Sequence, residues 1–391
     1  MSTNGSRPRA LVITRNLPPL VGGMERLLWH IVDELRAEYE VHVVGPRGCG
    51  EYLPADVNAS EVPLRPLWRF LASAKFVSAR LALRLKPQLV FAGSGLTAPA
   101  AWLAARLSGG HCVAYLHGLD IEAGHRLYHL LWHPFLRHCD RLLVNSSYTR
   151  RLAESVGIDP QRIEMLHPGV ALPERVQAGL LRERFRQDHR LEDRPVMLYV
   201  GRITARKGLL PFVRDILPSI DAGIPSWRLV VIGSEPVDAL AHKEEIGERL
   251  RDALQGNGLG DRITWLPHVD DRELTAAYFA ADVMIFPVQE LAGDHEGFGM
   301  VAMEAAAHGL PTVAFAAGGV TDAVANGRSG TLVRPGDNDA FAQATIALLG
   351  AAPGERTAMA TSARAFASGF TWPDFGHRLN RLCRKRQAAE S

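Results

Sequence analysis

Short, continuous apolar runs alternate with longer helical patterns along this chain of 391 residues. Apolar runs without polar interruptions are typical of parallel strands that are buried on both faces, with helices as the connections between them. The predicted strands form two series, namely Ala10–Thr14, Val41–Val44, Leu89–Ala92, Cys112–Leu116 and Leu142–Asn145, and then Val196–Val200, Arg228–Ile232, Ile263–Leu266, Val283–Pro287 and Thr312–Phe315. We therefore expect an α/β protein with two doubly wound, Rossmann-like domains.

The length of the chain also favours two domains, because single cores rarely grow beyond about 250–300 residues. Residues 172–195, between the two series, are highly charged and contain no strand pattern, so we expect the domain junction there. We place the first domain at residues 1–175 and the second at 176–372. Ligands bind beyond the carboxyl ends of parallel strands, and two domains that present these ends to each other would form a cleft.

The charge is balanced in total but unevenly distributed. The chain has 44 Lys and Arg against 42 Asp and Glu, which argues against a nucleic-acid-binding protein, since such proteins carry a strong positive excess. Residues 1–170 carry five more basic than acidic residues, whereas the remainder carries three more acidic than basic ones. No Asp or Glu occurs between Glu61 and Asp120.

This acid-free stretch contains a basic amphipathic pattern over residues 65–86, with Trp68 and Phe70 at its flanks. At helical spacing, one face carries Leu67, Leu71, Ala74, Leu81 and Leu85, and the opposite face carries Arg65, Arg69, Arg80 and Arg84. Such a helix can lie on an anionic membrane surface. The alternative is an ordinary domain helix with a solvated basic face.

The cysteine pattern and the beginning of the chain predict a cytoplasmic protein. Cys49, Cys112, Cys139 and Cys383 are far apart and form no CxxC pair, which argues against a disulfide framework and a structural zinc site. The first apolar run is too short for a signal peptide. His125, His129 and His133 share one helix face, but without an accompanying carboxylate motif we favour a solvated face or an interface over a metal site.

Two glycine-containing loops follow predicted strands. Gly22 and Gly23 open a helix, where an approaching anion would meet backbone amides; the alternative is an ordinary strand-to-helix turn. The second loop runs from Gly201 to Gly208, and its Arg202 and Lys207 could converge on a diphosphate. The alternative for these two residues is a solvated basic loop.

Glu296 and Glu304 form the most specific element of the sequence. If a helix begins near Gly297, Glu304 lies about two turns along it, roughly 11–12 Å from Glu296. This separation suits two ends of an extended ligand better than an acid/base pair on one bond, where carboxylates are about 5–9.5 Å apart. The alternative is a cap residue and a surface residue, but Glu304 has strongly apolar neighbours.

His117 follows the predicted strand Cys112–Leu116 and precedes a glycine. A histidine at the end of a strand can bind a hydroxyl group or exchange a proton with it. A hydrogen-bonded structural histidine is an equally reasonable interpretation. Asp120, in the same loop, is a weaker candidate.

In their order along the chain, these elements resemble the retaining glycosyltransferases of family 4, which have the GT-B fold of two Rossmann-like domains facing each other across a cleft. The segments Leu166–Val170, Gly309–Val313 and Gly318–Val320 add to the resemblance, which covers nearly the whole chain. The second domain is similar to bacterial mannosyltransferases. The resemblance implies transfer of a hexose, with retention, from a nucleotide sugar to a glycan or lipid-linked acceptor in cell-surface polysaccharide or glycolipid synthesis. GDP-mannose is the favoured donor, and a UDP-sugar is the second choice.

The resemblance also implies a role for each candidate residue. The catalytic set would be His117, Glu296, Arg202 and Lys207. The donor site would add Gly22, Gly23 and Gly201 near the diphosphate, His268 and Val269 near the base, Glu304 at the ribose, and the backbone of Gly297, Phe298, Gly299 and Met300. Glu296 would bind hydroxyls of the transferred sugar, and Gly23, His117 and Asp120 would face the acceptor. Residues 289–295 form a longer loop than the shortest family members have.

The resemblance further implies that the first domain binds the acceptor and the second the donor, and that a helix over 373–391 returns to the first domain. We expect no metal and no cofactor, because the cations of the protein would neutralise the diphosphate and no Asp-x-Asp motif is suitably placed. A peripheral location on the inner face of the membrane would suit a lipid-linked acceptor. The alternatives are a non-catalytic, sugar-nucleotide-binding subunit of a glycan assembly complex and another GT-B enzyme, such as a sugar-nucleotide epimerase.

Overall fold

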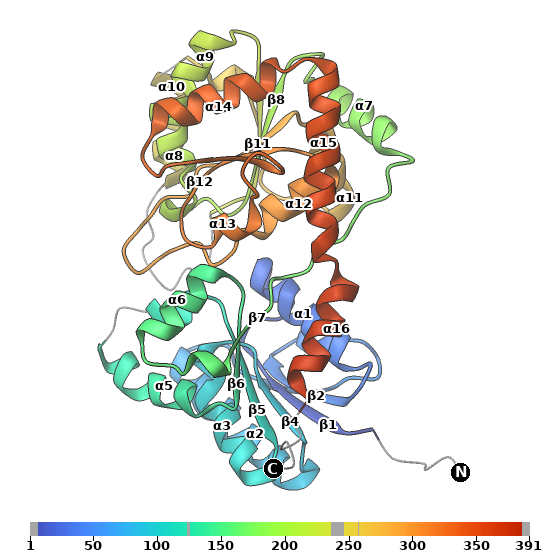
Figure 1. Cartoon of the computed structure of the whole chain (residues 1–391), viewed down its shortest axis with the longest axis vertical. Helices are drawn as coiled ribbons and strands as arrows, with labels where there is room; N and C mark the ends of the chain where they lie inside the picture. Colours follow the sequence, from blue (N-terminus) through green and yellow to red (C-terminus); the bar gives the residue numbers. More distant parts are fainter. Residues whose placement is uncertain (1–6, 123–125, 236–245, 257, 385–391) are drawn as a thin grey trace. The chain divides into compact units, whose positions relative to one another are not determined.

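The computed structural model describes residues 7–122, 126–235, 246–256 and 258–384. The chain divides into two compact units, residues 1–169 with 372–391 and residues 170–371. In the described residues each unit contains one parallel sheet between two layers of helices (Figure 1). The predicted α/β fold class with two Rossmann-like domains is confirmed.

The first unit is built on a seven-stranded sheet, counted over its described residues. In spatial order its strands are β3 (Asn58–Val62), β2 (Glu40–Pro46), β1 (Arg9–Ile13), β4 (Leu89–Ala92), β5 (His111–Leu116), β6 (Arg141–Val144) and β7 (Ile163–Met165). Its helices are α1 (Gly23–Leu35), α2 (Leu67–Leu85), α3 (Ala98–Ser108), α4 (Leu119–Glu122), α5 (Arg126–His138), α6 (Ser147–Ser155) and α16 (Trp372–Cys383).

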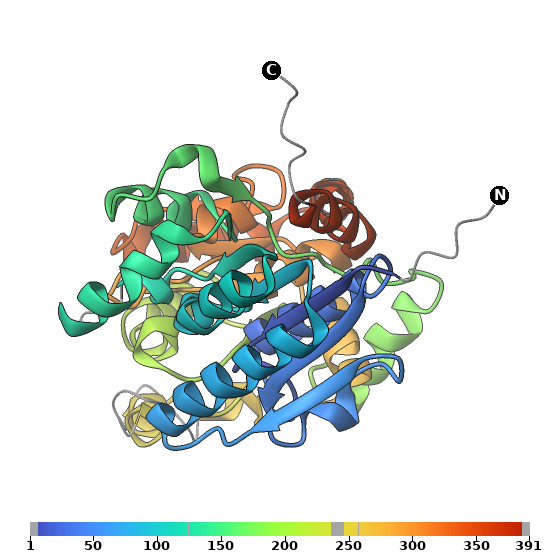
Figure 2. The same cartoon turned by 90° about the horizontal axis from the view of Figure 1, so that it is seen from below.

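The two faces of this sheet are covered by different helices. Alternate strand residues such as Leu11, Val90 and Ala114 form one core with α2 and α3, which lie side by side (Figure 2). On the other side of the unit, α16 packs against α1, where Asn380 donates a hydrogen bond of 3.0 Å to the carbonyl of Glu34. The C-terminal helix therefore belongs to the first unit, and residues 385–391 of the helix predicted over 373–391 lie outside the described residues.

The second unit has a six-stranded sheet, again counted over its described residues. In spatial order the strands are β10 (Ile263–Leu266), β9 (Arg228–Ile232), β8 (Val196–Val200), β11 (Val283–Phe286), β12 (Thr312–Phe315) and β13 (Gly330–Val333). The helices are α7 (Ala178–Asp188), α8 (Leu209–Pro211), a π-helical turn (Phe212–Ile216), α9 (Leu217–Gly223), α10 (Ile246–Gly256), α11 (Asp271–Ala280), α12 (Met300–His308), α13 (Val320–Ala323), α14 (Asn338–Gly350) and α15 (Pro353–Ala367).

Successive residues of the central strand β8 enter two different cores of the second unit. Val196, Leu198 and Val200 pack with α7, α11, α12 and α15, whereas Met197 and Tyr199 pack with α9, α10 and α14. This alternation follows from the period of two residues in a strand. It explains why the strand appears in the sequence as an uninterrupted apolar run.

The strands absent from the sequence prediction are β3, β7 and β13, and each of them lies at an edge of its sheet. The residues of β3 are mostly exposed, so this strand shows no apolar run. An edge strand has a neighbour on one side only and does not need the continuous burial of a central strand. The sequence pattern therefore identified the interior of both sheets and missed three of their edges.

The charged residues 172–195, where we expected the junction, lie inside the second unit and include α7. Arg182 and Arg186 of this helix bind the buried carboxylate of Asp282, with N–O distances of 2.7 and 2.8 Å. Charges that look like those of a solvated linker are thus paired with an acidic residue about a hundred positions later. The two units meet in the chain at Gly169–Val170 and at Thr371–Trp372.

Candidate active site

The loop after β8 carries two predicted site residues, Arg202 and Lys207, beyond the carboxyl end of this central strand. Its first residue, Gly201, has a φ of 150°, and the Ile203 amide donates a hydrogen bond of 3.0 Å to the carbonyl of Ser234. A Cβ atom on the adjacent Gly233 would lie 2.0 Å from the Gly201 carbonyl oxygen, so a glycine is required for this close approach. The loop then ends in a short 3-10 turn, Ala205–Lys207, which fixes the next two basic residues.

Lys207 and Arg206 are both buried, and both bind the carboxylate of Glu296. The Lys207 ammonium lies 2.8 Å from Glu296 Oε2 and 5.0 Å from the centre of the Phe286 ring. The Arg206 guanidinium donates to the same oxygen, and its Nε lies 3.0 Å from Asp294 Oδ1. Among the described residues, none donates a hydrogen bond to the second oxygen, Glu296 Oε1. Sequence reasoning missed Arg206 and Asp294, because their roles depend on contacts across about 90 residues.

These cations determine the ionisation of the cluster. Burial raises the pKa of Glu296, but the charges of Lys207, Arg206 and Arg202 outweigh it and lower the pKa to about 2. Burial lowers the pKa of Lys207, and the neighbouring carboxylate opposes that shift. Glu296 is therefore a carboxylate at neutral pH, which can accept hydrogen bonds but cannot donate a proton.

Arg202 lies in the same loop but takes no part in the ion cluster. Its side chain is exposed, whereas its carbonyl accepts a hydrogen bond of 3.1 Å from the Tyr199 hydroxyl. Its charge still acts on the cluster, because it lowers the pKa of Glu296 and of Lys207. The predicted diphosphate-binding pair thus comprises one exposed and one buried cation.

The segment from Glu296 to Glu304 is helical only in its second half. The helix α12 begins at Met300 and not near Gly297, so the expected two helical turns between the carboxylates are wrong. Gly299 has a φ of 97°, which is left-handed and ends any continuous helix on its N-terminal side. The first amides of α12 receive no side-chain cap from Gly299 and, like the first amides of any helix, have no partner within the helix.

Backbone contacts hold Glu296 and Gly297 in place. The Gly319 amide donates a hydrogen bond of 2.8 Å to the Glu296 carbonyl. A Cβ atom on Gly319 would lie 2.0 Å from the Gly297 carbonyl oxygen, so two stretches of main chain are in direct contact here. The segment Gly318–Val320, which contributed to the resemblance, therefore supports the loop that carries Glu296.

Glu304 is not isolated among apolar side chains. The Tyr278 hydroxyl of α11 donates a hydrogen bond of 2.9 Å to Glu304 Oε2, and this partner explains how the carboxylate tolerates its neighbours. His268 and Val269 follow β10 and precede α11, with His268 exposed and Val269 half-buried. Phe298 is buried in the core against which Val269 also packs, so its contribution to a ligand would come from its backbone.

In the first unit, His117 is buried at the end of β5. Its Nε2 lies 2.9 Å from the Gly93 carbonyl oxygen, and because a carbonyl can only accept, Nε2 is the donor of this hydrogen bond. The His117 amide donates a hydrogen bond of 3.0 Å to Asp120 Oδ2. Asp120 thus orients the loop around His117.

The Gly22–Gly23 pair begins α1, after β1 and the segment Asn16–Val21. The Asn16 side-chain amide donates a hydrogen bond of 2.8 Å to Glu25 Oε1 in the first turn of this helix. A Cβ atom on Gly22 would lie 2.5 Å from the other oxygen of Glu25. The Glu25 carboxylate therefore lies against one side of the loop, and an anion could approach only the backbone amides on the other side.

The described residues provide no metal cluster: no three His, Cys, Asp or Glu side chains among them come together. His125 lies outside the described residues, as does the side chain of His129, and His133 is buried. His133 therefore does not lie on a solvated face, and the interface stays a prediction.

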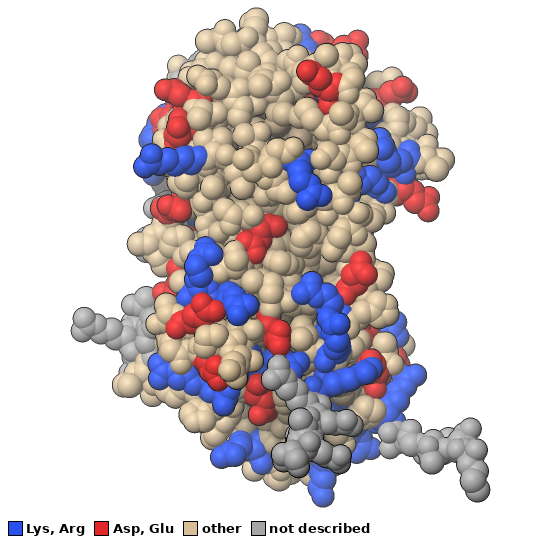
Figure 3. Space-filling model, viewed as in Figure 1, with Lys and Arg blue, Asp and Glu red and all other residues tan. Residues whose placement is uncertain are grey.

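The helix α2 buries the apolar face predicted for residues 65–86. Leu81 and Ala74 are buried and Leu67, Leu71 and Leu85 are half-buried, so this face packs into the first unit and cannot enter a membrane. The exposed face contains three large apolar side chains among its Arg and Lys residues, namely Trp68, Phe76 and Leu83. Lys and Arg side chains are spread over the first unit on the face seen in Figure 3. No helix among the described residues is long and apolar enough to span a membrane.

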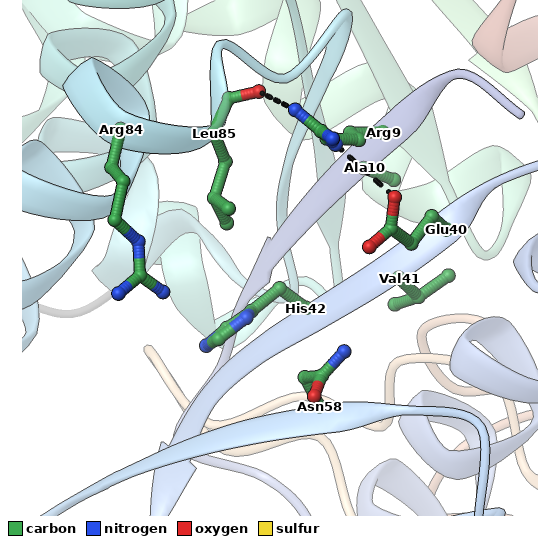
Figure 4. Close-up of a pocket in the computed structure, with 8 residues that line it drawn as sticks. All are labelled: Arg9, Ala10, Glu40, Val41, His42, Asn58, Arg84 and Leu85. Atoms are coloured by element: carbon green, nitrogen blue, oxygen red, sulfur yellow. Dashed lines mark hydrogen bonds and ion pairs between the residues drawn. The ribbon is translucent and has the colours of Figure 1, made fainter. Parts of the chain in front are cut away.

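A pocket of about 210 Å³ lies at the amino ends of β1 and β2, next to the end of α2 (Figure 4). Arg9 crosses it, with Nε 3.1 Å from Glu40 Oε2 and Nη1 donating to the carbonyl of Leu85 at 3.0 Å. None of the predicted catalytic, donor-binding or acceptor-binding residues lines this pocket, whereas Arg84 and Leu85 of the predicted amphipathic helix do.

Comparisons with known proteins find relatives over nearly the whole chain. Residues 21–173 match the family described as Glycosyltransferase Family 4, and residues 194–351 match Glycosyl transferases group 1. The chain is 30% identical to the GDP-mannose-dependent alpha-(1-6)-phosphatidylinositol monomannoside mannosyltransferase of Mycolicibacterium smegmatis, over 97% of this chain and 99% of that protein. It is 35% identical to the D-inositol 3-phosphate glycosyltransferase of Mycolicibacterium paratuberculosis, over 60% of this chain and 50% of that protein.

Solved structures show a similar fold at lower sequence identity. The crystal structure of HepE from Anabaena in complex with UDP and glucose has a TM-score of 0.78 at 18% identity, covering 96% of this chain and 98% of that one. The sucrose-phosphate synthase from Thermosynechococcus elongatus has a TM-score of 0.78 at 21% identity, with the same two coverages.

Proposed function

The chain belongs to glycosyltransferase family 4 and is a transferase with the GT-B fold, and on this premise we propose that it moves a hexose from a nucleotide sugar with retention of anomeric configuration. The acceptor is a glycan or a lipid-linked sugar of cell-surface polysaccharide or glycolipid synthesis. One observation carries the proposal. Glu296 is a largely buried carboxylate, 12% exposed, with two cations on one oxygen and no hydrogen bond from a described residue to the other.

This arrangement suits a sugar diphosphate. Lys207 and the exposed Arg202 supply positive charge for the two phosphates, and the first amides of α12 favour an anion as well. Oε1 of Glu296 accepts a hydrogen bond from a hydroxyl of the sugar, while Glu304, with its Tyr278 partner, binds the ribose. His268 and Val269 approach the base.

The reaction that we propose forms a bond from the acceptor oxygen to the anomeric carbon and breaks the bond from that carbon to the phosphate oxygen. The departing diphosphate takes the proton of the acceptor hydroxyl, which balances the reaction without a protein nucleophile. Lys207 and Arg202 lower the barrier by stabilising the negative charge that develops on the leaving group. Protein cations serve this purpose, so we propose that the enzyme uses no metal, and transfer should be unchanged in EDTA.

GDP-mannose is the proposed donor, because the relative that matches nearly the whole chain is named for it. A UDP-sugar is the alternative, since the neighbouring structure of HepE contains UDP. A thermal-shift screen of GDP-, UDP- and ADP-sugars separates them, as a bound ligand raises the unfolding temperature by mass action. A nucleotide-release assay with the stabilising donor and candidate acceptors then tests transfer. Binding without release in the presence of any acceptor would favour the non-catalytic subunit.

For a lipid-linked acceptor, we propose that the exposed face of α2 rests on an anionic membrane surface on the cytoplasmic side. Trp68 and Phe76 would enter the interface while Arg69 and Arg80 meet lipid phosphates, a combination typical of interfacial helices. Flotation with vesicles that contain anionic lipid tests this. We expect Trp68→Ser with Phe76→Ser to abolish flotation, and Val176→Ser, at an exposed apolar residue of the second unit, to leave it unchanged. Absence of wild-type flotation at low salt would remove the membrane from the proposal.

A further inference from the structure

Arg206 is buried beside the predicted phosphate-binding residues, yet its geometry points toward the sugar end of the site. Its side chain is 9% exposed, and both carboxylates that it contacts belong to the segment before α12. In addition, its carbonyl accepts a hydrogen bond of 2.8 Å from the Gln289 amide, at the start of the same loop. Arg206 therefore connects the loop after β8 with residues 289–296.

The two cations on Glu296 differ in what else they can reach. Lys207 has the Phe286 ring as its other neighbour, so its ammonium can turn toward a diphosphate without breaking a second ion pair. Arg206 uses two separate edges of its guanidinium, with Nε at Asp294 and Nη1 at Glu296. Only a planar group with several fixed donors can bridge two carboxylates in this way. Binding of a diphosphate would thus draw on Lys207 and leave the Arg206 bridge intact.

The remaining oxygen of Glu296 is oriented by this bridge. A carboxylate whose Oε2 is fixed at a buried guanidinium presents Oε1 in one direction, and no described residue occupies that direction with a hydrogen-bond donor. We propose that Arg206 is a positioning residue for the transferred sugar, which acts through Asp294 and Glu296 so that Oε1 accepts a hydroxyl of that sugar. This inference rests on the proposed transferase function and adds to it the residue that distinguishes the sugar from the diphosphate.

Comparing a nucleotide sugar with its nucleoside diphosphate isolates the contribution of the sugar. Calorimetry with GDP-mannose and GDP, and with UDP-glucose and UDP, measures how much more tightly the nucleotide sugar binds than its nucleoside diphosphate. This affinity ratio is compared between the wild type and Arg206→Gln. We expect the variant to lose about 100-fold in transfer kcat/KM, as for a misplaced reacting group, and to lose the extra affinity for the sugar. Its affinity for the bare diphosphate should stay within about threefold, because that part of the ligand is bound by other residues.

Three further variants separate positioning from charge and from folding. Arg206→Lys keeps the charge but cannot bridge two carboxylates, so it should behave like Arg206→Gln. Asp294→Asn, at a side chain that is 47% exposed and thus tolerant of change, should lower transfer about tenfold in the same direction. Arg182→Gln is the matched control, since Arg182 is also an arginine of the second unit that binds a buried carboxylate. It should lower the unfolding temperature and leave the affinity ratio unchanged.

Each outcome decides between distinct possibilities. Full transfer activity in Arg206→Lys would overturn the proposal by showing that charge alone suffices. Equal losses of affinity for GDP-mannose and GDP in Arg206→Gln would also overturn it, since Arg206 would then belong to the phosphate site while the transferase function stood. If the wild type bound no nucleotide sugar at all, the proposed function would fail and this inference with it.

Discussion

Asp282 and Glu296 are both buried carboxylates of the second unit, and each meets two basic side chains, yet the two clusters are completed differently. Both oxygens of Asp282 are used, one by Arg182 and the other by Arg186 and the Val196 amide. The two arginines bind backbone carbonyls with their other donors, such as those of Ala280 and Arg194. The cluster at Glu296 places both cations on one oxygen instead.

This difference separates a structural ion cluster from one that can bind a ligand. In the Asp282 cluster both carboxylate oxygens and the Nη1 and Nη2 atoms of both arginines have partners within the fold, so an added ligand would have to displace one of them. At Glu296 one acceptor oxygen has no hydrogen bond from a described residue, and Lys207 could exchange the shared carboxylate for a ligand. Burial and charge are alike in the two places, and the distribution of contacts over the two oxygens distinguishes them.

Lys207→Ala should have the largest effect at the Glu296 cluster. We expect turnover to fall about 100- to 1,000-fold, as when a preorganised donor to a developing negative charge is removed. The nucleotide-release rate at saturating donor measures it, with circular dichroism and thermal unfolding as the control for folding. A purified, folded variant with the wild-type rate would show that the cation of this cluster does not serve the leaving group.

The pH dependence of stability probes the carboxylate of the same cluster. The pKa of folded Glu296 is about 2, below its ordinary value of 4.5, so folding favours the ionised form. Its stabilising effect is complete above about pH 4.5 and is lost as the pH falls toward 2, and the shift corresponds to about 3 kcal/mol.

Urea unfolding of the wild type and Glu296→Gln at pH 6, 4.5 and 3 measures this effect. The unfolding free energy of the wild type minus that of Glu296→Gln should be constant from pH 8 to 5. Below pH 4.5 this difference should decrease, because the wild type loses stability. A difference that is the same at pH 6 and pH 3 would mean that the cations do not hold the carboxylate ionised.

Asp282→Asn tests the structural cluster, with the opposite pattern of effects. Removing the shared carboxylate leaves the Arg186 guanidinium without its counter-charge, which should lower the unfolding free energy by about 2–3 kcal/mol. This is less than for a fully buried ion pair, because Arg182 is about one-third exposed and solvent screens its charge. Well below the unfolding temperature, the transfer rate should equal that of the wild type. Loss of transfer at unchanged stability would remove the distinction between the two clusters.

Glu304 represents a third case, a carboxylate that accepts a hydrogen bond from the Tyr278 hydroxyl. We expect Glu304→Ala to weaken nucleoside diphosphate binding about tenfold, or about 1.4 kcal/mol, through loss of its contact with the ribose. Calorimetry measures this, and Tyr278→Phe, which keeps the carboxylate but removes its partner, should have a smaller effect. Unchanged affinity in Glu304→Ala would assign the residue to the fold alone.

The sequence predicted those parts of the molecule whose signal is local. Central strands such as Leu89–Ala92 are buried on both faces, and each appears as one apolar run. The edge strand Asn58–Val62 lacks such a run, because one of its sides has no neighbouring strand. Burial alone was therefore sufficient for the interior of each sheet and for the edge strand β10, and insufficient for the other three edge strands.

The same distinction applies to the candidate site. Gly201, Lys207 and Glu296 were recognised because each lies in a motif of a few residues after a strand. Arg206 and Asp294 belong to no such motif, and their ion pair joins two segments that are distant in sequence. The one local signal for Arg206 was its position next to Lys207 in a loop that was already predicted to bind an anion.

The main-chain contact between Gly319 and Gly297 limits how donor choice could be redesigned. Any side chain at position 319 would begin 2.0 Å from a carbonyl oxygen, so a combinatorial library that includes this position would consist almost entirely of misfolded members. Residues 289–295 offer a more productive search space, since several of them are exposed and one of them contacts the guanidinium behind Glu296. Changes there would alter the surroundings of the sugar while the backbone that carries the carboxylate keeps its path.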